Sequence, residues 1–192
     1  MRIQMGIPRG AKAQAAALYW GAFGEKLGTV MGPEPKAMAY ILRVIDSRHA
    51  ISAVDDDGTL LGVVGFKTNK GALVGGTYSD FAAIYGHLGA IWRAVLLSLL
   101  ERDTENRRFL MDGIFVAPAA RGKGVGSALL VAIMNEGHQR GYPSLRLDVI
   151  DTNPRAKALY ERHGFAPTDT TKLGPLRHIF KFHSVTTMVK KL

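Results

Sequence analysis

The sequence of 192 residues contains no cysteine. This absence excludes a disulfide framework and a thiolate metal site, and any covalent nucleophile would have to be another type of residue. A chain without disulfides suits a reducing cytoplasm, which is the compartment we expect. At this length, an apolar content of 47% predicts a single compact α/β domain over residues 1–192.

The sequence also lacks a secretion signal and a long apolar run. The N-terminal segment MRIQMGIPRG does not have the charged and then apolar layout of a signal peptide. The longest apolar run, near Ala94 to Leu100, is broken by Arg93 and Ser98. We therefore expect a soluble protein with no membrane partner.

Clusters of basic residues are absent as well, although the formal net charge is +9. The lysines and arginines are scattered, and no short block combines several of them with aromatic residues. Nucleic acid is therefore not an expected partner. A solvated basic surface explains the charge, and a cofactor carrying several phosphates would be attracted by the same field.

Helical and alternating apolar patterns divide the first half of the chain. Asp55-Asp56-Asp57-Gly58 separates two apolar runs, and Asp-Gly at such a place is a strong hairpin signal because both residues tolerate positive φ. The expected elements are a strand at 2–5, helices at about 13–27 and 36–45 with a loop at 28–35 between them, and hairpin strands at 49–54 and 60–67.

Residues 69–108 read as a helical insertion. A glycine-rich stretch leads to Ser79-Asp80, which could cap a helix, and then to an apolar helix at about 89–101. Its apolar residues are too few to span a bilayer, so core packing or a homodimer contact is the expected role. Residues 104–108 read as a polar connector.

The second half alternates strand and helix more clearly. Asn153-Pro154 predicts a helix start, because asparagine is a good N-cap and proline suits the first helical position. The expected elements are strands at 110–116 and 145–149, helices at 126–140 and 153–164, and one or two final strands within 177–189.

A phosphate-binding loop is predicted at Arg121-Gly122-Lys123-Gly124-Val125-Gly126-Ser127, between a strand and a helix. Glycines let backbone N–H groups approach an anion, and a helix N-terminus adds unpaired donors and a positive dipole. The cationic side chains add charge. A glycine-rich turn with solvated cations is the alternative reading.

Two better-known phosphate motifs do not match this loop. A P-loop needs serine or threonine after Gly-Lys, but Gly124 follows Lys123, and Ala117 stands where its first glycine belongs. The dinucleotide fingerprint needs a glycine at the position of Ser127. ATP hydrolysis and NAD binding are therefore disfavoured.

Two signatures about thirty residues apart identify a family resemblance. Arg121-x-x-Gly124-x-Gly126 follows the strand Asp112 to Pro118 and precedes Asn153-Pro154-x-Ala156-x-x-Leu159-Tyr160-x-x-x-Gly164-Phe165. Together they resemble the GNAT (GCN5-related) N-acetyltransferase superfamily, closely over about residues 111 to 165. The resemblance implies an α/β (α+β) fold with a mixed sheet of about six to seven strands, splayed middle strands and flanking helices.

The resemblance also implies where acetyl-CoA lies. The cofactor would enter the gap between the splayed strands, with its pantetheine paired to main-chain groups of one strand and its pyrophosphate on the loop amides. The residues implied for cofactor binding are Phe115, Val116, Arg121, Gly122, Lys123, Gly124, Val125, Gly126, Ser127, Asn153 and Ala156. No metal is expected.

Tyr160 and Asp112 are the candidate catalytic residues. A phenol can donate a proton or a hydrogen bond to a departing thiolate, and the spacing of Tyr160 from Asn153 and Ala156 puts all three on one helix face. Packing in the core is the alternative for Tyr160, and an ion pair is the alternative for Asp112 as base. The expected activity is acetyl transfer to a primary amine on a small molecule or peptide in a ternary complex; a non-catalytic acyl-CoA-binding module is the alternative.

Overall fold

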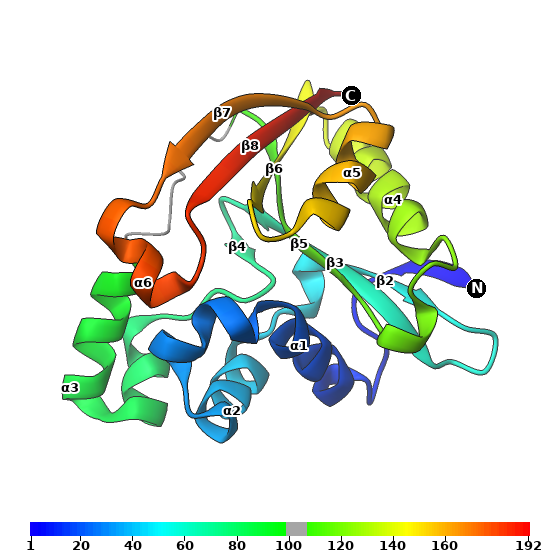
Figure 1. Ribbon diagram of the computed structural model, residues 1–192. Coiled ribbons are helices and arrows are strands. Elements are labelled where there is room, and N and C mark those ends of the chain that lie inside the picture. Colours follow the sequence, from blue (N-terminus) through cyan, green and yellow to red (C-terminus); the bar gives the residue numbers. More distant parts are fainter. Residues whose placement is uncertain (99–106) are drawn as a thin grey trace.

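The computed structural model describes residues 1–98 and 107–192, which form a mixed sheet with helices on both faces (Figure 1). The strand order is β1-β2-β3-β5-β6-β8-β7, and the short β4 pairs with β3. Only the β5–β6 pair is parallel among these described strands. The strands are β1 (Arg2–Met5), β2 (Ala50–Val54), β3 (Leu60–Thr68), β4 (Gly71–Ala72), β5 (Phe109–Val116), β6 (Ser144–Ile150), β7 (Ala166–Lys172) and β8 (Ser184–Lys191).

The helices cover the sheet from two sides. Figure 1 shows α1 and α2 on one side, with α4 and α5 on the other. Their bounds are α1 (Lys12–Met31), α2 (Glu34–Val44), α3 (Tyr78–Ser98), α4 (Val125–Gln139), α5 (Pro154–Arg162) and α6 (Arg177–Phe180). Because both faces are covered, β2 and most of β3 are buried. The mixed α/β fold expected from the sequence is confirmed.

The largest core cluster lies between α4 and the sheet. Leu129, Leu130 and Ile133 recur on one face of α4, and each is fully buried against apolar side chains of the strands. A second cluster joins α1 to the opposite face and includes Ala15 and Phe115. The two helices thus fix the middle of the sheet from both sides.

Strands β5 and β6 pair over only two positions and then separate. Phe109 faces Leu145 and Leu110 faces Arg146, after which the register records no β5–β6 pair among the described residues. β5 continues along β3 to Val116, while β6 pairs with β8 over its whole length. The splayed middle strands expected from the family resemblance are therefore present.

A β-bulge in β5 marks the point of divergence. Gly65 on β3 faces Gly113, but the preceding pair joins Phe66 to Met111, so Asp112 is an extra residue. A bulge bends its strand and redirects side chains on either side of it. Met111 packs in the α4-side core, whereas a Cβ on Gly113 would lie 2.5 Å from Phe23 Cζ of α1. Because of the bulge, Met111 and Gly113 lie on opposite faces of the sheet although they are only two residues apart.

Local predictions based on turn and cap chemistry are confirmed. The Gly58 N–H donates to the Asp55 carbonyl at 3.1 Å, and Gly58 has φ +88°. Asn153 Oδ1 accepts from the Ala156 N–H at 3.2 Å, which caps α5. These motifs are satisfied within a few residues, which explains why they can be read from sequence.

The predicted boundaries in the N-terminal half are partly wrong. α1 continues to Met31, so most of the predicted 28–35 loop is helical, and both Val30 and Met31 are buried. Burial of this last turn outweighs the weak helix propensity of Gly28. Likewise, α3 begins at Tyr78, well before residue 89, and is kinked at Gly86, whose φ is +72°.

The predicted C-terminal part of the insertion lies partly outside the described residues. The expected helix end at residue 101 and most of the 104–108 connector fall in 99–106. The cap prediction is correct in part: Asp80 accepts from the Thr77 N–H at 2.9 Å, one residue before α3 begins.

The predicted C-terminal strands are wrong at their start. Residues 177–180 form the short helix α6. A strand, β7, precedes this helix, and the sequence analysis missed it. β7 contains Pro167 and Asp169 because it is an edge strand whose side chains are mostly exposed. Edge position removes the apolar alternation that would have revealed the strand.

By length and composition alone, helix α3 is long and apolar enough to cross a membrane. Of its apolar stretch, 17% is buried inside the structure. The sequence prediction that its apolar residues are too few is wrong on those criteria. The kink at Gly86 divides the described part of α3, in which residues 87–98 extend over about 18 Å. Leu88, Ile91 and Val95 on this segment are exposed, and the homodimer contact stays a prediction.

We expect Leu129→Ala to lower the free energy of unfolding by about 2–5 kcal/mol, because it leaves a cavity in the α4 core. Leu88→Ala removes the same atoms from a side chain that is 85% exposed and should change stability by less than about 0.5 kcal/mol. Urea unfolding of both variants measures the difference. Equal losses would contradict the assignment of α4 to the core.

Candidate functional site

The glycine-rich loop turns the chain from β5 into α4. Gly122 and Gly124 have φ of +78° and +80°, and Gly124 is the N-cap residue of α4. A Cβ at either position would meet no atom within 4 Å. Backbone conformation and not crowding therefore requires glycine at these two positions.

The first turn of α4 presents unpaired backbone donors. The first N–H bonded inside the helix is that of Ala128, which donates to the Gly124 carbonyl at 3.0 Å. The N–H groups of Val125, Gly126 and Ser127 therefore have no acceptor within the helix. The Val125 side chain is buried in the core and holds this end of α4 in place. Such a terminus binds anions.

Helices α4 and α5 and strand β8 contact one another beside the loop. A Cβ on Gly126 would lie 3.4 Å from Leu159 Cδ2, an ordinary van der Waals distance, so the start of α4 lies directly beside α5. Ser127 Oγ and His163 Nε2 are 3.0 Å apart, and Lys190 Nζ of β8 donates to the His163 carbonyl at 2.7 Å. His163, which the sequence analysis did not single out, thus connects α5 to both α4 and β8.

The β3–β5 register decides which main-chain groups of β5 face the opening. The Ala117 N–H donates to the Leu61 carbonyl, so alternation directs the groups of Phe115 toward β3 and those of Ile114 and Val116 away from it. The Val116 carbonyl accepts from Arg121 Nε at 3.3 Å, which agrees with this direction. The main-chain pairing with pantetheine that was predicted for Phe115 is thus available to Ile114 instead. Phe115 packs against α1.

A cavity of about 550 Å³ occupies the space between the separated strands and the helices. Its lining combines β5 residues at the bulge, the end of β6, α1, the region around the start of α3, and α5. Asp112, Asn153, Ala156 and Tyr160 all line it. The structure therefore brings both predicted catalytic residues and two predicted cofactor residues to one cavity.

The bulge directs Asp112 into this cavity. Its Oδ2 accepts from the Leu73 N–H at 3.2 Å, which fixes the carboxylate against the segment between β4 and α3. The pKa of Tyr19, another lining residue, is raised by burial and further by the negative charge of Asp112. Asp112 is therefore close enough to act electrostatically on groups within the cavity.

Tyr160 presents a buried phenol to the same space. The residue is 5% exposed, and burial raises the pKa of its hydroxyl above the usual value of 10.0. The ring also packs in the α4-side core, 6.0 Å from the ring of Phe165. Core packing and a place at the cavity thus coexist, and the hydroxyl keeps its proton at neutral pH.

Two charged lining residues were missed by the sequence analysis. Lys26 lies one turn after Phe23 on α1, and burial lowers the pKa of its ammonium to about 8. Asp148 on β6 accepts from the Thr187 hydroxyl at 2.7 Å and from Arg146 at 3.3 Å. The spacing of Tyr19, Phe23 and Lys26 along one helix was the available signal for Lys26.

The described residues include no group of three or more His, Cys, Asp or Glu side chains that could hold a metal ion.

Comparison with protein families gives a match to the acetyltransferase (GNAT) family over residues 13–165. Mycothiol acetyltransferase from Jonesia denitrificans is 34% identical over 96 residues, which are 47% of this chain and 28% of that protein. The matched segments cover between 28% and 40% of the lengths of the curated relatives.

Solved structures share the fold over about three quarters or more of the chain. An N-acetyltransferase from Staphylococcus aureus Mu50 superposes with a TM-score of 0.69 at 12% identity and covers 99% of this chain and 100% of that one. A streptothricin acetyltransferase homologue from Bacillus anthracis, solved in complex with acetyl coenzyme A, has a TM-score of 0.51 at 14% identity over 74% of this chain and 61% of its own.

We expect Lys26→Met to stabilise the protein at pH 7, because a lysine whose pKa falls from 10.5 to about 8 on folding costs stability while it is charged. This cost is complete below pH 8 and disappears as the pH rises toward 10.5, so the advantage of Lys26→Met should shrink over that range. Chemical unfolding at pH 7 and pH 10 measures it.

Lys12→Met is the matched control, since Lys12 is exposed in the first turn of the same helix. A Lys26→Met variant whose stability relative to wild type does not change between the two pH values would contradict the burial of the ammonium.

Proposed function

We propose that this chain, which belongs to the acetyltransferase (GNAT) family, transfers an acetyl group from acetyl-CoA to a primary amine bound in the cavity. Members of this family are acyl-CoA N-acyltransferases. The observation that carries the proposal is continuity: the phosphate-binding loop begins where β5 ends, and the separation of β5 from β6 leads into a cavity lined by Asp112 and Tyr160.

The pyrophosphate of CoA binds the start of α4. Backbone amides between Gly122 and Ser127 donate to the phosphate oxygens, and Arg121 and Lys123 add positive charge. The acetyl-CoA complex of the B. anthracis neighbour, which has the same fold, supports this choice of co-substrate. No acyl-enzyme intermediate is required.

The pantetheine arm follows the opening between the strands. Ile114 and Val116 offer the main-chain groups that face away from β3, and Asn153 and Ala156 line the cavity from α5. An extended arm that pairs with β5 takes the place of the missing β6 partner. The arm carries the thioester toward Tyr160.

The reaction forms a bond between the amine nitrogen and the thioester carbonyl carbon, and the carbon–sulfur bond breaks. Two protons leave an acceptor that arrives as an ammonium. Asp112, directly or through water, accepts one, and the other reaches the sulfur through the Tyr160 hydroxyl. Because burial raises the pKa of Tyr160, its hydroxyl is protonated when the thiolate forms. Binding both substrates in one cavity supplies proximity and orientation.

We expect Gly124→Asp to weaken CoA binding by more than about 100-fold relative to Gly124→Asn. Asparagine and aspartate have the same shape and share the strain at φ +80°, so only the aspartate adds negative charge beside the pyrophosphate. Calorimetric titration with CoA measures both variants. Equal affinities would overturn the assignment of the loop to phosphate binding.

We expect Tyr160→Phe to lower kcat by about 100-fold with little change in CoA affinity, because it removes a proton donor but keeps the ring. Tyr142→Phe, in the core beside Phe109, should have no such effect on kcat. Thiol release from acetyl-CoA with a panel of amines measures turnover.

A wild-type protein that binds CoA tightly and acetylates no amine would identify a non-catalytic acyl-CoA-binding module. Unchanged turnover in Tyr160→Phe would remove this residue from the mechanism.

A further inference from the structure

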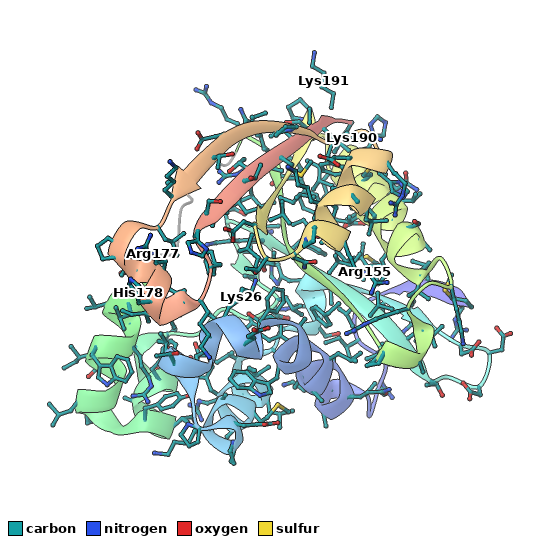
Figure 2. The ribbon with its side chains drawn as sticks, in the orientation of Figure 1. Lys26, Arg155, Arg177, His178, Lys190 and Lys191 are labelled. Carbon is teal, nitrogen blue, oxygen red and sulfur yellow. The ribbon has the colours of Figure 1, made fainter. Side chains whose placement is uncertain are left out.

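The cavity contains charges of both signs. Asp112 and Asp148 enter it from β5 and β6, and Lys26 enters it from α1. In Figure 2 Lys26 lies between α1 and the strands, whereas Arg177 on α6 and Lys191 at the end of β8 lie toward the outside. Among the described residues, a ligand in this space therefore meets two carboxylates and one ammonium.

The two carboxylates already have donors from the protein. Asp148 accepts from a threonine hydroxyl at 2.7 Å and from Arg146 at 3.3 Å. Asp112 accepts from the Leu73 N–H at 3.2 Å. Charges held in this way are partly compensated before any substrate binds.

Lys26 is compensated much less. In the described part of the chain, its one specific contact is with the face of the Phe23 ring, 4.4 Å from the ring centroid. Burial lowers its pKa to about 8, and no carboxylate among the described residues opposes that effect. A partly buried ammonium in this state is stabilised by an anion that enters the cavity.

We infer that the acceptor of the proposed reaction carries a carboxylate as well as its primary amine, and that Lys26 binds this carboxylate while Asp112 lies at the amine. The inference rests on the proposed function and names its substrate class: small amino acids and related amino carboxylates. The opposite charges of Lys26 and the acidic pair orient such a molecule, with its amine toward the thioester.

The rest of the lining suits a small substrate with an apolar body. The aromatic side chains of Tyr19, Phe23, Tyr40 and Phe81 border the cavity. Its volume of about 550 Å³ falls within the usual size range of small-molecule sites. Lys26 Nζ lies 4.4 Å from the centroid of the Phe23 ring, and that ring lies against Gly113, the neighbour of Asp112, so the ammonium and the carboxylate occupy neighbouring parts of the cavity wall.

Matched pairs of amines that differ only by a carboxylate test the inference. The probes are phenylalanine with 2-phenylethylamine, 4-aminobutyrate with propylamine, and 6-aminohexanoate with pentylamine. For at least one pair, wild-type kcat/KM should be about tenfold or more higher for the carboxylate-bearing member, the gain typical of a charged hydrogen bond. Lys26→Met should remove this preference, and Lys26→Arg should retain most of it.

Calorimetric binding of the same probes to the CoA-loaded protein separates failure of this inference from failure of the proposed function. Carboxylate-dependent binding that disappears in Lys26→Met supports the inference even without turnover. Equal or better binding and turnover of the plain amines overturns it, and so does the absence of carboxylate-dependent binding in every pair. A loss of kcat in Lys26→Met that is equal for both members of each pair would make Lys26 a general base and also overturn the inference.

Discussion

The separation of β5 from β6 is the constraint on which the site depends. Strand β5 pairs with β3 along most of its length, and the bulge at Asp112 bends it away from β6, which stays with β8. Backbone groups on the open side of β5 can therefore pair with a ligand instead of a strand. The same bulge turns the Asp112 side chain into the cavity. One extra residue therefore both separates the strands and places a carboxylate in the cavity lining.

The packing of α4 holds the proposed phosphate-binding loop in place. Val125 is buried at the start of the helix, and Leu129 and Ile133 continue the buried face along it. Because the core holds α4, its unpaired first amides keep their direction without a ligand. The contacts of His163 with Ser127 and with Lys190 tie α5 and β8 to the same point, so the loop and Tyr160 are positioned together.

The charged lining of the cavity reduces the stability of the folded chain. Burial of the Lys26 ammonium beside the Phe23 ring is unfavourable while the lysine is charged. Such groups are retained in a fold when they act on a ligand, since an apolar side chain would pack there at lower cost. The amine and carboxylate proposed for the acceptor would each meet a group of opposite charge.

The sequence by itself determined the features whose physics is local: the Gly122–Ser127 loop, the Asn153 cap, the Asp55–Gly58 hairpin and the apolar face of α4. Tertiary structure decided the extension of α1 to Met31, the edge strand β7, the direction of the Asp112 side chain and the burial of Lys26. A turn or a cap is satisfied by neighbours within a few residues, whereas strand register, edge position and the polarity around a side chain depend on segments far apart in the chain.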